Sequence, residues 1–143
     1  MTGFRAQELL RLAVRVGDVE VGRVVDVLVD SVGGRVLGVD ILCRDESHRF
    51  LSLSATDIGD GVIVAGSPFT LLAEDQLDFY RKRATTFRTL RGTPVQVHGR
   101  NVGLLADVVL KPDGEITDLV VANGRSRSRY RWNDALLISA SAA

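Results

Sequence analysis

The sequence predicts a mainly β protein, built from two tandem small antiparallel β-barrels joined by a short α-helix. Three observations support this prediction. The segment VGRVVDVLVD at residues 21–30 returns as VGLLADVVL at 102–110, short β-branched runs alternate with glycine-containing turns, and one central segment has helical periodicity. A chain of 143 residues allows one ordinary domain or two very small ones. We place the first barrel at residues 1–69, a helical linker at 70–88 and the second barrel at 89–143.

The repeat has a constant offset over its first half. Each copy has a valine, a glycine and an aspartate at matching positions. At an offset of 81 these pairs are Val14 with Val95, Gly22 with Gly103, and Asp26 with Asp107. The offset then becomes 80, because the turn SVGG has one residue more than PDG, and loops tolerate such a change. We therefore expect residues 9–66 and 90–140 to superpose as two copies of one barrel.

Each copy contains short strands joined by tight turns, in the same order. The first copy has LAVRV, VGRVVDVLVD, RVLGVDIL, HRFLSL and GVIVA, and the second has PVQV, VGLLADVVL, EITDLVVA, RYRW and ALLISA. The turn PDG and the pair Asn123 and Gly124 supply the positive-φ positions that hairpins need. Strands at such short spacing favour antiparallel barrels over parallel βαβ units.

Residues 70–87 interrupt the strand pattern and predict a helix of roughly three turns. The apolar residues that would share one helical face are Leu77, Tyr80, Ala84 and Phe87. Acidic residues lie early in the segment and basic residues late, as the helix dipole favours. We expect Leu77, Tyr80 and Phe87 to be buried against a barrel or a subunit face, and Arg81 and Lys82 to be exposed to solvent.

The two aspartates of the repeat are unusual within β-branched strands. Counting by twos places each on one face with two apolar residues, which are Val24 and Leu28 for Asp26, and Leu105 and Val109 for Asp107. An unpaired buried carboxylate is costly, so each should accept backbone N–H groups at a turn or rim, which would favour its ionised form. The alternative is a metal or acid–base site, for which carboxylates in separate barrels are poorly placed. We assign both a structural role.

Glycines within strands mark bulges or sharp bends, so Gly22 and Gly103 also receive a structural role. His48 and His98 lie in predicted turns, well apart, whereas a metal site needs several converging ligands. Cys43, the only cysteine, excludes an internal disulfide and fits a reducing cytosol. The sequence has no nucleophile elbow and no phosphate-binding glycine loop. It therefore predicts no catalytic residue, no metal site and no cofactor.

The segment GRSRSRYRW is the strongest candidate for a binding surface. Every second residue of this segment is an arginine, namely Arg125, Arg127, Arg129 and Arg131. In an extended strand these arginines would face one way, while Tyr130 and Trp132 would turn inward. Such a row fits phosphate groups, RNA or an acidic protein surface. The alternative is a solvated edge strand whose charges deter aggregation, and a pI near 6.7 argues against a dedicated nucleic-acid binder.

These segments resemble PRC-barrel domains. The resemblance rests on VGRVVDVLVD, GGRVLGVDIL and RFLSL in the first copy, and on VGLLADVV, DGEITDLVV and YRW in the second. LDFYRKR followed by LRGTPV resembles the junction of tandem PRC-barrel proteins, so the match covers essentially the whole chain. The family includes the cytoplasmic part of the photosynthetic reaction-centre H subunit and a domain of a ribosome maturation factor. Both are binding or assembly modules without chemistry in the barrel.

The resemblance implies a non-catalytic protein-interaction or assembly module, an adaptor of the bacterial cytosol with an unknown protein partner. The alternative is an RNA- or ribosome-associated assembly factor that uses the arginine-rich second barrel. Each copy is so small that it should pack on the other copy, on the helix or on a second chain, and a homo-oligomer is one of these options. No apolar run approaches the roughly 18 residues that span a bilayer, and the N-terminus does not resemble a signal peptide, so we expect no membrane insertion.

Overall fold

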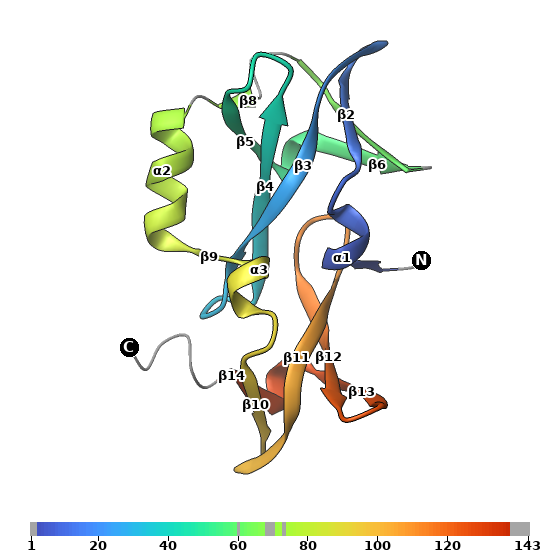
Figure 1. Ribbon diagram of the computed structural model, residues 1–143, viewed down its shortest axis with the longest axis vertical. Helices are drawn as coiled ribbons and strands as arrows, with labels where there is room; N and C mark the ends of the chain where they lie inside the picture. Colours follow the sequence, from blue (N-terminus) through green and yellow to red (C-terminus); the bar gives the residue numbers. More distant parts are fainter. Residues whose placement is uncertain (1–2, 60, 68–70, 73, 138–143) are drawn as a thin grey trace.

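The computed structural model describes residues 3–59, 61–67, 71–72 and 74–137. Two curled β-sheets lie one beyond the other along its long axis, and helix α2 (Glu74–Arg83) lies beside the first sheet (Figure 1). This arrangement confirms the predicted mainly β class, with two small barrel-like sheets joined by a short helix.

The first sheet is formed by β2 (Ala13–Val16), β3 (Val19–Asp30), β4 (Arg35–Cys43), β5 (His48–Ser52), β6 (Thr56–Gly59), β7 (Val62–Ala65), β8 (Leu71–Leu72) and β9 (Thr85–Thr86). Its strands follow the order β6-β7-β2-β3-β4-β5-β8, and β9 pairs with β3. All of these pairs are antiparallel except β2 with β7, which is parallel.

The second sheet is formed by β10 (Pro94–Val97), β11 (Arg100–Leu110), β12 (Ile116–Asn123), β13 (Ser126–Arg131), β14 (Ala135–Leu137) and β1 (Phe4–Arg5). Its order is β13-β12-β11-β10-β14, and β1 pairs with β11. The short helices are α1 (Ala6–Leu9) and α3 (Phe87–Leu90), and single 3-10 turns are η1 (Leu53–Ala55) and η3 (Trp132–Asp134).

The two sheets repeat the same strand registers. The matching pairs are Val14 with Gly22 and Val95 with Gly103, then Asp26 with Asp40 and Asp107 with Val120. The residues of β11 follow those of β3 by 81, and the residues of β12 follow those of β4 by 80. A bulge lies beside Gly22 and beside Gly103, at the same step in both hairpins. The copies therefore agree residue by residue through these strands.

A second bulge changes the face on which each aspartate lies. Strand β3 advances from Val24 to Asp26 while β4 advances by a single residue. The extra residue reverses the alternation of side chains, so that Val24 and Val27 lie in the same core. The expectation that Asp26 shares a face with Val24 is therefore wrong. The same shift separates Asp107 from Leu105 in the second copy.

The copies differ after the 3-10 turns. In the first copy β6 turns back at Gly61 into β7, and β7 lies beside β2. In the second copy β14 follows η3 directly and lies beside β10, antiparallel to it. The extra hairpin reverses the chain once more, which is why only the first copy has a parallel pair. The predicted superposition of 9–66 on 90–140 therefore fails at this point, and residues 138–140 lie outside the described residues.

The linker is not one helix. Helix α2 ends at Arg83, and Thr85 and Thr86 pair with β3 instead of continuing it. The Thr86 hydroxyl then accepts the backbone N–H of Thr89, which caps α3. The ten residues of α2 agree with the predicted helix of roughly three turns. Phe87 belongs to α3, so its predicted place on the apolar face of that helix is wrong, because two β-branched residues form a strand and a cap.

The apolar face of α2 packs where the sequence places it. Leu77 is fully buried with Leu28 and Phe50, and the Tyr80 ring stacks on Phe50 with centroids 4.2 Å apart. Phe87 is also fully buried, but in the larger core that lies between the two sheets. The helix is thus fixed to the first sheet, while Phe87 packs at the junction of the copies.

At the offset of 81, β9 and α3 correspond to β1 and α1, so we count residues 85–88 with the second copy and not with the linker. Each copy places its first strand and helix on the other copy. β1 pairs with β11 through Phe4 and Leu110, and β9 pairs with β3 through Thr86 and Leu28. Two further bonds join the sheets, from Val36 N–H to Gly114 and from Ile116 N–H to Gly34. These two hydrogen bonds are equivalent at an offset of 80, so each copy makes with the other the contact that it receives. The copies share one core, and the packing of one copy on the other is one of the arrangements expected from the small size of each.

Candidate partner-binding surface

Strand β13 forms one edge of the second sheet. It pairs with β12 on one side, and on its other side no strand of the described part of the chain pairs with it. Arg127, Arg129 and Arg131 alternate along this strand and are exposed, so they share its outer face. Arg125 lies in the preceding turn, and the prediction of four arginines in one strand is therefore wrong for this residue.

The charges of this edge are only partly compensated. Arg129 Nη2 lies 3.1 Å from Asp118 Oδ2 on the neighbouring strand. Within the described residues, the side chains of Arg125, Arg127 and Arg131 make no ion pair or hydrogen bond. The β13 edge therefore presents exposed positive charge beside an unpaired strand backbone.

The aromatic residues of β13 and η3 turn toward the interior. Tyr130 lies opposite Leu119 and packs partly buried against the core. Trp132 reaches the first copy, where its indole contacts Gly34. A Cβ at Gly34 would collide with that ring, and the positive φ of 70° there also favours glycine. The sequence-based assignment of these two rings to the inner side thus agrees with their positions.

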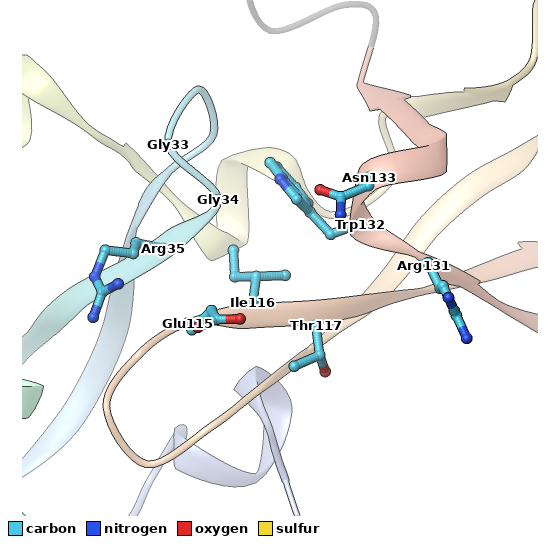
Figure 2. A pocket seen from close by; sticks show the side chains of 9 residues that line it. All are labelled: Gly33, Gly34, Arg35, Glu115, Ile116, Thr117, Arg131, Trp132 and Asn133. Atoms are coloured by element: carbon cyan, nitrogen blue, oxygen red, sulfur yellow. The ribbon is translucent and has the colours of Figure 1, made fainter.

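A pocket of about 470 Å³ lies between the copies at the end of β13. It is lined by Gly33, Gly34, Arg35, Glu115, Ile116, Thr117, Arg131, Trp132 and Asn133. Figure 2 shows Arg35 and Arg131 on opposite sides, with Trp132 and Ile116 between them. The pocket extends the β13 edge into a polar cleft, because Arg131 belongs to both.

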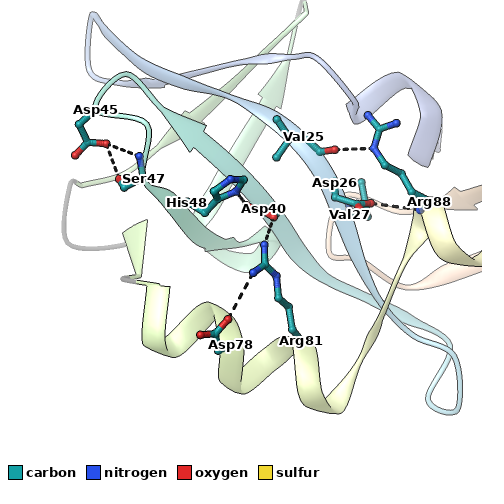
Figure 3. Close-up of polar contacts among 10 residues, drawn as sticks. All are labelled: Val25, Asp26, Val27, Asp40, Asp45, Ser47, His48, Asp78, Arg81 and Arg88. Carbon is teal, nitrogen blue, oxygen red and sulfur yellow. Dashed lines mark hydrogen bonds and ion pairs between the residues drawn. The ribbon is translucent and has the colours of Figure 1, made fainter.

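Asp26 and Asp107 each hold a helix of the other copy. Asp26 Oδ1 accepts the backbone N–H of Val27 at 2.8 Å and that of Arg88 in α3 at 3.3 Å (Figure 3). Asp107 Oδ1 accepts the N–H of Val108 at 2.8 Å and that of Gln7 in α1 at 3.1 Å. Their structural role stays a prediction, which substitution tests.

Burial dominates the ionisation of Asp107. Asp107 is only 4% exposed, and desolvation raises the pKa of its carboxyl. The N–H groups of Val108 and Gln7 act in the opposite direction and lower this pKa. The expectation that backbone hydrogen bonds favour the ionised form is therefore wrong for Asp107, because two donors do not compensate for the loss of water.

Sequence reasoning missed a buried carboxylate, Asp40. Its oxygens lie 2.6 Å from Arg81 Nη2 and 2.9 Å from His48 Nδ1 (Figure 3). Arg81 is exposed, as expected, and it still pairs with Asp40. His48 does not lie in the predicted turn but begins β5. Asp40 is the one charged residue within the apolar run VLGVDIL at residues 36–42, and that interruption was the signal. The cluster fixes α2 to the first sheet.

The other candidate residues stay apart. His98 lies in the turn between β10 and β11, and Cys43 at the end of β4 is half-buried, which raises the pKa of its thiol. In the described ranges, no three His, Cys, Asp or Glu side chains converge to hold a metal ion. Within the same ranges no helix has the length and apolar character needed to cross a membrane.

No protein-family model matches this chain, and none of the curated proteins matches it. The resemblance to PRC-barrel domains therefore rests on the residue pattern described above.

Proposed function

We propose that this protein is a non-catalytic interaction module of the PRC-barrel type, which binds an acidic, extended segment of a partner protein along β13. One observation supports this best, namely that no described strand pairs with the outer edge of β13, which lies beside exposed arginines. An extended peptide can add a strand to such an edge, and its acidic side chains can pair with the arginines.

The alternative partner is RNA, and the aromatic residues argue against it. Proteins that bind single-stranded RNA stack its bases on exposed aromatic rings. Tyr130 and Trp132 are instead packed against the core and against Gly34. The arginines alone would contact phosphates, which carry no sequence information. The β13 edge therefore fits an acidic peptide better than a nucleic acid.

The test compares two probes with the full-length chain by fluorescence anisotropy. One probe is a ten-residue peptide that alternates glutamate and valine, and the other is a single-stranded RNA of similar charge. We expect the peptide to bind, and Arg127→Ser with Arg131→Ser to weaken binding by about fivefold to thirtyfold, since two exposed ion pairs together contribute about 1–2 kcal/mol. Arg15→Ser with Arg100→Ser is the control of equal charge on other strands.

The outcomes separate the two partners. Tighter binding of RNA, with a steep loss of affinity as salt rises, would favour the alternative. Equal effects of the β13 pair and the control pair would mean that only net charge matters. A peptide that fails to bind in low salt would contradict strand addition at β13.

A further inference from the structure

A second positively charged site lies away from β13, where α3 meets the first sheet. A pocket of about 310 Å³ is lined by Arg11, Arg23, Val24, Val25 and Arg88. The three arginines come from separate parts of the chain, namely the turn after α1, strand β3 and helix α3. Among the described residues, none of those that line this pocket is acidic.

The three positive charges are not neutralised within the described residues. Arg88 Nε donates to Val25 O at 2.8 Å, which holds its side chain beside the strand (Figure 3). Asp26 is close by, but its carboxylate accepts the backbone N–H of Arg88. No ion pair joins Arg11, Arg23 or Arg88 to a carboxylate in the described residues. Three neighbouring cations repel one another, and a bound anion would remove that repulsion.

The second copy shows what the same position looks like without this site. The residues equivalent to Arg11, Arg23 and Arg88 are Gly92, Leu104 and Gln7. The backbones correspond closely, since Arg11 N–H donates to Val24 O at 3.0 Å and Gly92 N–H donates to Leu105 O at 2.8 Å. The arginine cluster is therefore not needed to build this joint, and it exists in only one of two equivalent places.

Arg11 also has an unfavourable backbone conformation. Its φ is 76°, in the region that favours glycine, and the equivalent Gly92 has a φ of 90°. A side chain there costs conformational energy that glycine avoids. The first copy thus places an arginine at a strained position beside two others, which indicates a use for its charge.

We propose that Arg11, Arg23 and Arg88 bind the diphosphate group of a small phosphorylated ligand. Guanidinium groups bind phosphate oxygens in a bidentate manner and stay charged at every physiological pH. One phosphate group carries roughly −1.5 to −2 charges at pH 7, so two linked groups match three arginines better than one. Because Arg88 belongs to the second copy and the others to the first, the ligand joins the two copies. This site does not depend on the β13 edge.

The test is calorimetric titration of the full-length chain with inorganic pyrophosphate, with ADP and with malonate. We expect one diphosphate site per chain, weaker binding at high salt, and little binding of malonate. Equal affinities for pyrophosphate and ADP would assign recognition to the diphosphate alone, and tighter ADP binding would add a nucleoside contact. Both results support the site. Stronger binding of malonate, two equal sites per chain, or no diphosphate binding in low salt would overturn it.

The second copy supplies the variant. Arg11→Gly, Arg23→Leu and Arg88→Gln together give the first copy the residues that the second copy already has at this joint. We expect at least a tenfold loss of diphosphate affinity with an unchanged circular dichroism spectrum. Arg23→Leu alone should weaken diphosphate binding severalfold, and this single variant replaces the triple variant in the test if the triple variant does not fold. Arg15→Leu, Lys82→Gln and Arg100→Gln form the control, which removes equal charge outside the pocket. An equal loss in this control would show nonspecific attraction and overturn the proposal.

Discussion

Asp107 accepts the backbone N–H of Gln7, which lies 100 residues earlier in the chain. Asp26 accepts the N–H of Arg88 in the corresponding place. In each case the long strand of one copy holds the short helix of the other. The repeated aspartate therefore contributes to the junction between the copies as well as to its own strand.

Replacing Asp107 with alanine should destabilise the protein by about 1–3 kcal/mol, because the N–H groups of Gln7 and Val108 lose their acceptor at a buried site. Asp26→Ala should have a smaller effect within this range, since Asp26 is only half-buried. Urea denaturation measures both, with exposed Asp57→Ala as the control. If Asp107→Ala were fully stable but no longer bound a ligand that the parent protein binds, the carboxylate would be functional and not structural.

The raised pKa of Asp107 predicts a specific pH dependence. The Asp107 carboxyl holds its proton more tightly in the native state than in the unfolded state. Its contribution to the free energy of unfolding is therefore complete below the ordinary pKa of 3.8, and it disappears as the pH rises through the pKa of the folded state. Asp107→Asn removes this titration. The unfolding free energy of the parent minus that of Asp107→Asn should therefore decrease from pH 4 toward pH 7. An increase over that range would mean that the hydrogen bonds, not burial, control the carboxyl group.

The Asp40 cluster predicts that Arg81 contributes to stability despite its surface position. Arg81→Ala leaves a carboxylate that is 4% exposed with only the His48 imidazole beside it among the ion-pair partners described, and we expect a loss of about 1–3 kcal/mol. Lys82→Ala, on an exposed side of the same helix, should change stability by less than about 0.5 kcal/mol. Thermal unfolding monitored by circular dichroism compares them. Equal melting temperatures for the two variants would show that the ion pair is energetically neutral.

Phe87 should be a major contributor to the joint core. Phe87→Ala empties a fully buried position between the sheets and should cost about 3–5 kcal/mol. Phe79→Ala is the matched control, since Phe79 is 49% exposed on α2. If Phe87→Ala had an unchanged melting temperature, the copies would be joined loosely and would unfold independently.

The sequence predicts the strand registers well, because they follow from a repeat that is visible in the residues. The offset of 81 in β11 and 80 in β12 follows directly from the loop lengths. The bulge before Asp26 could not be predicted by counting alternate residues. Both faces of this strand are rich in apolar residues, so the pattern looks the same with or without an inserted residue. The prediction of the strand face on which Asp26 lies is therefore wrong.

Long-range pairing explains the other differences. Phe4, Arg5, Thr85 and Thr86 form two-residue strands whose partners lie on the other copy, and local propensity gives no sign of such pairing. The arginines of β13 were placed correctly from residue 127 onward, because alternation is a local property. The cluster of Arg11, Arg23 and Arg88 was not found, since its members converge only after the copies exchange segments.

The reciprocal exchange of β1 with β9 and of α1 with α3 has a consequence for the chain as a whole. Two separate molecules, each holding one repeat, would make the same contacts twice by domain swapping, so this protein is in effect a covalent dimer. Linking the halves makes their association independent of protein concentration. It also removes symmetry as a constraint. A true homodimer carries every substitution in both halves, whereas the linked chain can keep glycine at residue 92 and place arginine at residue 11.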